Sequence, residues 1–241
     1  MKETIWNGFK RMDFTFEGMD AILVFPDDSN RTGKWLFKTE YFGAFPEAEI
    51  QMLHLGWHLA YVRNITRWCM EEDIDRKMRF ADFLQKEYGL SEKCIPVGMS
   101  CGGMIAVYFA AKYPEKVSAL YLDAPVMNFL SCPANFGVAK GNMLEEFMRD
   151  RKMSLSELIC YREHPIDKIP LLVENDIPVL LIYGEEDDVV PFCENGKCLV
   201  DYYMAHGKII EVIGKKNCGH HPHGLDDVKP IIDFMLKYKD R

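Results

Sequence analysis

Short apolar runs alternate with helical periodicities along most of the chain. The apolar runs predict an N-terminal hairpin from residues 14–17 and 19–25, followed by further strands. Those strands are expected at 35–38, 58–62, 94–99, 117–122, 178–183 and 208–213. Apolar residues at helical spacing predict helices at about 46–56, 75–88, 102–112, 195–205 and 227–239. Because strands separated by helices pair in parallel through right-handed crossovers, we expect the α/β class, with a mostly parallel sheet covered on both faces.

One stretch interrupts this rhythm. Residues 123–177 contain helical pieces at 143–149 and 155–161 but no convincing strand. Unstructured loops of that length are uncommon in compact domains. We therefore expect a helical insertion at 127–175 within a single domain that spans residues 1–241.

Composition and charge narrow the range of partners. The chain has 241 residues, 48% of them hydrophobic, and a formal net charge of −8 at pH 7. A negative surface repels phosphate backbones and anionic lipids, so we expect neither a nucleic acid nor a membrane as partner. A small-molecule substrate is expected instead. The apolar runs are too short to span a bilayer and the charged N-terminus lacks the apolar core of a signal peptide, which predicts a cytoplasmic protein. The sequence is compatible with a homo-oligomer as well as with a monomer.

The first candidate for chemistry is Gly98-Met99-Ser100-Cys101-Gly102-Gly103, a G-x-S-x-G pattern between a predicted strand and a predicted helix. Such a match arises by chance in roughly one chain in ten, so its position between a strand and a helix is stronger evidence than the residue pattern itself. In this position the glycines let strand and helix approach, and Ser100 Oγ points out at the carboxyl end of the sheet. The N–H of Cys101 would then stabilise an oxyanion. The competing interpretation is an ordinary strand–turn–helix with a serine cap.

A serine nucleophile needs a base, and the base needs an acid that orients it. An acidic run follows the predicted strand at 178–183, and in it Asp187 is the preferred acid, with Asp188 second. A solvated acidic loop is the competing interpretation. Asp123, directly after the strand at 117–122, is a further candidate, either as the acid or as a cap for the turn that follows.

Three histidines follow the last predicted strand within four positions. His220 comes after a glycine that lets the loop bring an imidazole over the sheet edge, so it is the preferred base, with His221 second. His223 is expected to be structural or to face the substrate. Histidine clusters also bind metals, but the sequence offers no companion ligand motif, so neither a metal nor a cofactor is expected. The chain order Ser100, Asp187, His220, each just past a predicted strand, favours a catalytic triad.

With these residues the chain resembles the α/β-hydrolase superfamily over roughly residues 19–238. The resemblance is carried by the Ser100 motif, by Gly184-x-x-Asp187-x-x-Val190-Pro191 and by Gly219-His220. It implies Ser100 as nucleophile, Asp187 as acid and His220 as base, and it identifies the insertion with the family's variable lid. Segments 38–46, 56–61, 123–126 and 219–224 are also similar to uncharacterised bacterial members, some near carbohydrate esterases, which suggests an ester-type substrate.

The loop after the strand at 35–38 departs from the family's pattern. Many members carry His-Gly there, whereas this chain has Thr39-Glu40-Tyr41. A backbone N–H of Glu40 or Tyr41 could still be the second oxyanion donor, because side-chain identity matters little to an amide donor. The Glu40 carboxylate is unexpected, since a negative charge opposes an oxyanion. It could point away and bind sugar hydroxyls, or pair with Arg63.

These observations predict a serine hydrolase that cleaves a carboxylic ester through an acyl-enzyme, with deacetylation of a carbohydrate as the specific suggestion. Serine peptidase or thioesterase chemistry would use the same residues, and a non-catalytic binding protein on the same fold is the contrasting hypothesis. Trp57, Phe129 and His223 are the candidates for substrate binding, although aromatic residues in such loops more often pack in a core.

Overall fold

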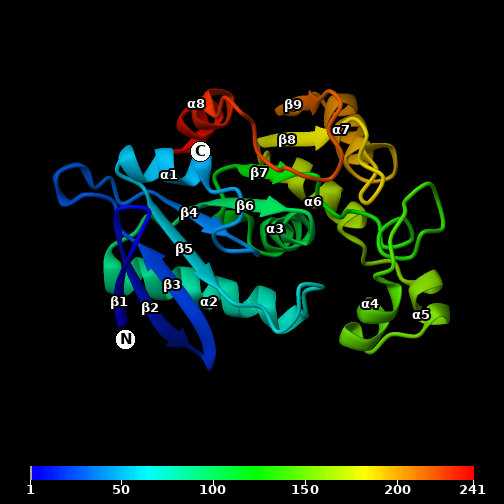
Figure 1. Cartoon of the computed structure of the whole chain (residues 1–241), viewed down its shortest axis with the longest axis horizontal. Helices are drawn as coiled ribbons and strands as arrows, with labels where there is room; N and C mark the ends of the chain where they lie inside the picture. The colour runs from blue at the N-terminus through cyan, green and yellow to red at the C-terminus, as the bar shows by residue number, and fades with distance from the viewer. Residues whose placement is uncertain (1) are drawn as a thin grey trace.

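One nine-stranded sheet runs through residues 2–241, the part of the chain that the computed structural model describes. Its order is β1-β2-β3-β5-β4-β6-β7-β8-β9, and helices lie on both of its faces (Figure 1). The first three strands and β5 pair antiparallel, whereas β5, β4, β6, β7, β8 and β9 pair in parallel. The expected α/β class is therefore confirmed.

The strands are β1 (Lys2–Trp6), β2 (Phe9–Phe16), β3 (Met19–Val24), β4 (Trp35–Lys38), β5 (His58–Val62), β6 (Ile95–Met99), β7 (Leu120–Asp123), β8 (Val179–Gly184) and β9 (Ile210–Lys215). The α-helices are α1 (Glu47–His54), α2 (Glu71–Tyr88), α3 (Cys101–Lys112), α4 (Leu144–Arg151), α5 (Leu155–Cys160), α6 (Ile169–Glu174), α7 (Gly196–Ala205) and α8 (Lys229–Tyr238). Short 3-10 helices occur at Asp28–Asn30, Pro114–Lys116, Pro165–Lys168 and Phe192–Glu194.

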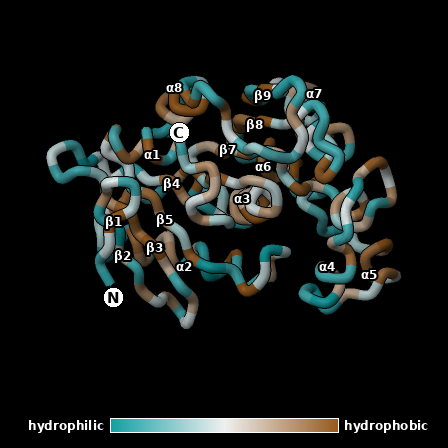
Figure 2. The backbone as a smooth tube through the Cα atoms, viewed as in Figure 1, coloured by the Kyte–Doolittle hydropathy of each residue, from teal (hydrophilic) through white to brown (hydrophobic). Residues whose placement is uncertain are grey.

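Alternate residues of the central strands supply two apolar layers, one on each face of the sheet. Phe37 and Leu122 point into the layer beneath α2, α3, α6 and α7, whereas Leu36 and Tyr121 point into the layer beneath α1 and α8. Both faces of these strands are buried, which explains their continuous apolar runs in the sequence. Figure 2 shows hydrophobic segments along the central strands and hydrophilic ones in the outer turns.

Two elements near the N-terminus differ from the sequence prediction. Strand β1 is not predicted, because at the sheet edge most of its residues are exposed and no alternation of apolar residues marks it. Helix α2 begins at Glu71 and not at residue 75. Asp73 Oδ2 accepts a hydrogen bond of 2.9 Å from Met70 N, and the acidic first turn suits the positive end of the helix dipole.

The segment between β7 and β8, which the structure describes in full, contains helices and no strand. Helices α4 and α5 lie at one end of the molecule, beyond α3, while α6 packs against α3 and α7 in the body (Figure 1). No helix within residues 2–241 is long and apolar enough to cross a bilayer.

Candidate active site

The arrangement of the strands indicates where a site should lie. Strand β4 pairs with β5 on one side and with β6 on the other, so the crossovers of the parallel part run in opposite directions from this point. In open α/β sheets, ligands bind outside the carboxyl ends of the strands at such a switch point. The loops that follow β4 and β6 carry Glu40 and Ser100.

The turn between β6 and α3 is strained and tightly packed. Ser100 has φ 54° and ψ −120°, a backbone conformation that non-glycine residues rarely adopt. A Cβ on Gly98 would lie 2.5 Å from Gly102 O, and one on Gly103 would lie 2.4 Å from Pro125 Cβ. Gly98 is thus required for the approach of β6 and α3, and Gly103 for the approach of α3 and the loop after β7. The half-buried Ser100 side chain stands at the carboxyl end of the sheet.

Ser100, His220 and Asp187 form a continuous chain of hydrogen-bond contacts. His220 Nε2 lies 3.0 Å from Ser100 Oγ, and His220 Nδ1 lies 2.8 Å from Asp187 Oδ2. The other oxygen of Asp187 accepts hydrogen bonds from Val189 N at 2.9 Å and Val190 N at 2.8 Å. Burial alone would raise the pKa of Asp187, but the hydrogen bonds from His220 and from Val190 N outweigh it and lower that pKa. The carboxylate therefore stays ionised at neutral pH and can orient the imidazole.

Two backbone amides lie near Ser100 as potential donors to an oxyanion. Cys101 is the first residue of α3, where N–H groups have no partner within the helix and the helix dipole is positive. Tyr41 N donates to the Glu40 carboxylate at 3.3 Å and is therefore engaged. Glu40 N lies beside the start of α3, 3.4 Å from where a Cβ on Gly102 would stand. Of the two predicted second donors, Glu40 N is thus the better placed.

The Glu40 carboxylate is held by uncharged donors. It accepts hydrogen bonds from Tyr61 Oη at 3.4 Å and from Asn64 Nδ2. Arg63 pairs instead with Asp20, at 3.6 Å, so the predicted Glu40–Arg63 pair is wrong. No motif marks Asn64 in the sequence, although it follows β5 at the same edge of the sheet as the rest of the site.

A second carboxylate–imidazole pair lies next to the first. Asp123 Oδ1 is 2.9 Å from His223 Nδ1, and Asp123 Oδ2 accepts a hydrogen bond of 2.7 Å from Gly224 N. Both side chains are almost completely buried. Asp123 therefore contacts His223 and not His220, which leaves Asp187 as the acid that the geometry supports.

Asp188 and His221 are not members of the hydrogen-bond chain that ends on Ser100, although the rings of His221 and His220 are adjacent, with centroids 4.8 Å apart. Asp188 is 59% exposed and approaches Lys140 Nζ at 3.5 Å. His221 is exposed and stacks on Phe45 with ring centroids 5.7 Å apart. Partial burial and the neighbouring rings of His220 and His223 lower the pKa of His221, so it is neutral at pH 7.

The three histidines of this loop do not fit a metal ion, although ligand atoms of His220, His221 and His223 lie within 4.8 Å of one another. Both ring nitrogens of His220 are engaged, with Ser100 and Asp187, and His223 Nδ1 is engaged with Asp123. A catalytic zinc ion takes three protein ligands. Recruiting His220 as the third would break its contact with Ser100 or Asp187.

The predicted substrate-binding residues are buried. Trp57 precedes β5 and packs in the layer beneath α1, at the opposite edge of the sheet from Ser100, so that prediction is wrong. Phe129 is 0% exposed and packs against Phe147 and Tyr161 inside the insertion, so it presents no surface to a substrate. His223 takes the structural role, paired with Asp123, and does not face a substrate.

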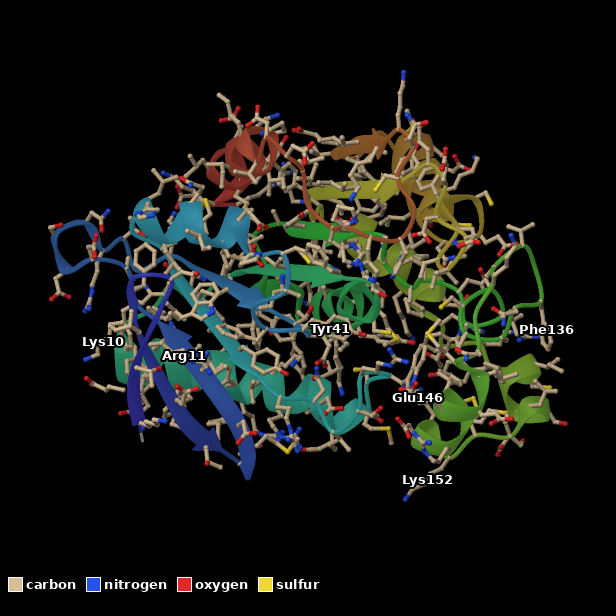
Figure 3. All side chains as sticks on the ribbon, viewed as in Figure 1. Lys10, Arg11, Tyr41, Phe136, Glu146 and Lys152 are labelled. Atoms are coloured by element: carbon tan, nitrogen blue, oxygen red, sulfur yellow. The ribbon has the colours of Figure 1, made fainter. Side chains whose placement is uncertain are left out.

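Contacts from α4 reach the loops around the site. Arg67 Nε donates to Glu146 Oε1 at 2.7 Å, and Thr66 Oγ1 donates to Asp150 at 2.8 Å. Arg67 also lies against the Tyr41 hydroxyl, whose pKa is raised by burial and by the nearby Cys101 thiol. Figure 3 places Tyr41 and Glu146 on the two sides of this junction, Tyr41 on the loop after β4 and Glu146 on α4. The sequence does not predict these partners, because no local pattern links positions so far apart in the chain.

About half of the chain is similar in sequence to known proteins. A family model described as alpha/beta hydrolase fold matches residues 72–159. The acylamino-acid-releasing enzyme of Rattus norvegicus is 30% identical over 124 residues, which is 51% of this chain and 16% of that protein. The Sus scrofa enzyme of the same name is 28% identical over 122 residues, again 16% of its length. The chain thus spans about one sixth of the length of these relatives.

Solved structures share the fold over nearly the whole chain. An acylaminoacyl peptidase in complex with Z-Gly-Gly-Phe-chloromethyl ketone has a TM-score of 0.76 and 17% identity, over 97% of this chain and 42% of that one. Porphyromonas gingivalis dipeptidyl peptidase 4 has a TM-score of 0.71 and 15% identity, over 97% of this chain and 35% of that one. At these identities the likeness shows the fold alone.

Proposed function

Because the chain belongs to the α/β-hydrolase superfamily, we propose that it is a serine hydrolase that uses Ser100, His220 and Asp187, and that its substrate is an acylated amino acid or short acylated peptide. One observation carries the catalytic part of this proposal. The contacts Asp187–His220 at 2.8 Å and His220–Ser100 at 3.0 Å form an unbroken chain that ends on the strained serine. A non-catalytic binding protein would have no need for that alignment.

The chemistry follows from the positions of these atoms. Ser100 Oγ attacks the acyl carbonyl while His220 Nε2 takes its proton, and Asp187 stabilises the imidazolium that forms. The N–H groups of Cys101 and Glu40 stabilise the oxyanion, a contribution of about 3–4 kcal/mol for each well-placed donor. His220 then protonates the leaving group as its bond to the acyl carbon breaks. In the second half of the reaction His220 Nε2 takes a proton from water, the water oxygen attacks the acyl-enzyme, and His220 returns the proton to Ser100 Oγ as the acyl–oxygen bond breaks. Each step uses groups of the chain itself.

The choice of substrate rests on the relatives. The curated relatives are named acylamino-acid-releasing enzymes and the two solved structures are named peptidases, which supports serine peptidase chemistry better than the carboxylic ester hydrolysis expected from the sequence. An amide leaves only after protonation, and His220 Nε2 is positioned to supply that proton. Carbohydrate deacetylation has less support, because Trp57 and Phe129 are buried and offer no stacking surface for a sugar ring.

The insertion at 127–175 is proposed to bound the substrate site as a lid. Its helix α4 contacts the loop after β5 through the Arg67–Glu146 and Thr66–Asp150 pairs. Arg67 in turn lies against Tyr41, next to the proposed oxyanion donors. A displacement of α4 would therefore shift Arg67 and, through it, the Tyr41 side chain at the edge of the proposed acyl site.

A fluorophosphonate probe tests the nucleophile. Wild type should be labelled and Ser100→Ala should not, while Ser154→Ala, which removes an exposed serine at the start of α5, should be labelled like wild type. An unlabelled wild type would overturn the proposal.

The substrate class is tested by turnover of three compounds: an N-acetyl amino acid p-nitroanilide, p-nitrophenyl acetate and an acetylated sugar. Cleavage of the anilide supports the peptidase hypothesis, and cleavage of the activated ester should accompany it. Turnover of the acetylated sugar without turnover of the anilide would restore the carbohydrate-ester hypothesis.

A further inference from the structure

The loop that carries His220 has little structure of its own. It runs from the end of β9 at Lys215 to the start of α8 at Lys229 without a helix or strand. Its position relative to Ser100 must therefore be fixed by contacts from other parts of the molecule. Asp187 fixes the ring of His220 through Nδ1, but that one contact does not fix the loop behind it.

Asp123, at the end of β7, connects this loop to the nucleophile. Its backbone oxygen accepts a hydrogen bond of 2.9 Å from Ser100 N. Its carboxylate contacts His223 Nδ1 at 2.9 Å and accepts from Gly224 N at 2.7 Å. One residue thus holds the serine by its main chain and the histidine loop by its side chain.

His223 connects Asp123 to the base through a contact between two imidazole rings. Its ring lies edge-on to that of His220, with centroids 5.0 Å apart, and edge-on to Phe45 at 5.3 Å. Only 3% of its side chain is exposed, so the ring has little freedom to shift. The buried charge of Asp123 is offset by Lys215 Nζ, 3.9 Å from Oδ2, which also donates to Pro222 O in the same loop.

We propose that Asp123 and His223 are positioning residues that keep the His220 loop in register with Ser100, separately from the orienting role of Asp187. This inference rests on the proposed function of Ser100 and His220. The two carboxylates then have different tasks, since Asp187 selects the tautomer and direction of the imidazole and Asp123 sets the distance between the base loop and the nucleophile. Misplacement by about 1 Å can cost about 100-fold in rate, so this anchor affects kcat more than substrate binding.

Steady-state kinetics on the full chain with p-nitrophenyl acetate test the proposal. His223→Ala should lower kcat by about 10- to 100-fold while KM stays within about twofold. In His223→Asn the side-chain N–H takes the place of Nδ1–H and can still donate to Asp123, so kcat should recover to within about fivefold of wild type. Fluorophosphonate labelling of Ser100 should slow and recover in the same order.

The matched control is Tyr121→Phe. Tyr121 lies on the same strand as Asp123, and its buried hydroxyl has no hydrogen-bond partner among residues 2–241, so the variant perturbs β7 without touching the loop. Its kcat should equal that of wild type. Should His223→Ala fail to fold, Asp123→Asn compared with Tyr121→Phe makes the same test, with an expected loss of about tenfold or more.

The outcomes separate the two proposals. An active, labelled wild type with an unchanged kcat in His223→Ala overturns the positioning role and leaves the proposed function intact. Equal losses in His223→Ala and His223→Asn also overturn it, because the contact with Asp123 would then not matter. A wild type that is neither labelled nor active refutes the proposed function, and the positioning role falls with it.

Discussion

Replacing Asp187 with asparagine should disable the base by changing its tautomer. Two backbone donors, Val189 N at 2.9 Å and Val190 N at 2.8 Å, converge on Asp187 Oδ1. In Asp187→Asn the amide oxygen should keep that place, because the opposite orientation would leave two N–H groups unsatisfied at about 1–3 kcal/mol each. The amide NH2 then faces His220 Nδ1 and donates to it. His220 Nε2 must carry the proton and can no longer accept one from Ser100.

The size of the effect follows from the loss of that proton acceptor. We expect kcat to fall by about 10³- to 10⁴-fold, which corresponds to about 4–5.5 kcal/mol of transition-state stabilisation. KM should change little, since Asp187 is buried behind the base and does not face the substrate. The assay is steady-state hydrolysis of p-nitrophenyl acetate, with the same protein checked by thermal unfolding.

Asp188→Asn is the matched control for this variant. Asp188 is the adjacent carboxylate, exposed and paired with Lys140, so its variant should keep kcat within about twofold of wild type. The reasoning would be refuted by an Asp187→Asn enzyme within tenfold of wild type, or by an equal loss in Asp188→Asn.

Three further predictions concern the turn, the buried layer and the substrate. Gly103→Ala places a Cβ 2.4 Å from Pro125 Cβ, so chemical denaturation should show a loss of about 1–3 kcal/mol in the free energy of unfolding. Lys38 and Glu49 form a pair at 2.6 Å with side chains 1% and 2% exposed, and Lys38→Met should cost about 3–5 kcal/mol because it leaves a buried carboxylate without its partner. Glu40 lies beside the proposed oxyanion donors, and its hydrogen-bond partners in the described part of the chain are uncharged, so an N-acetyl-lysine anilide should have a several-fold higher kcat/KM than the N-acetyl-glutamate compound. That ratio should shrink in 0.5 M NaCl, and a preference for glutamate would contradict it.

The central sheet could be predicted from the sequence because its strands are buried on both faces. Runs such as Val179–Gly184 are apolar at nearly every position, and each is followed by a turn and a helical period. The same criterion fails at the edge, where β1 pairs through its backbone while most of its side chains are exposed. It also fails for α6, since six residues that include a proline near the start carry no readable period.

In the candidate site, too, some features could be predicted from the sequence and others could not. The proximity of Ser100, Asp187 and His220 could be predicted because each follows a strand of a parallel sheet, and the carboxyl ends of such strands meet at one edge. Side-chain partners were not identifiable. Asp123 and His223 are 100 positions apart, and which of two histidines Asp123 contacts depends on the path of one loop. The choice between Arg63 and Asn64 as partner of Glu40 likewise turns on which of two adjacent side chains faces the sheet edge.

Each carboxylate near the proposed site has two opposite effects on the transition state. As Ser100 attacks, positive charge develops on His220 and negative charge develops at the oxyanion, so any carboxylate nearby favours one and opposes the other. Asp187 contacts His220 directly at 2.8 Å, and its influence is greatest on the imidazolium. The Glu40 carboxylate is tied to Tyr61 and Asn64, whose donated hydrogens offset part of its field at the oxyanion. The carboxylate that contacts the base is thus the one that can stabilise the imidazolium, whereas the carboxylate beside the proposed oxyanion donors is itself held by hydrogen bonds from Tyr61 and Asn64.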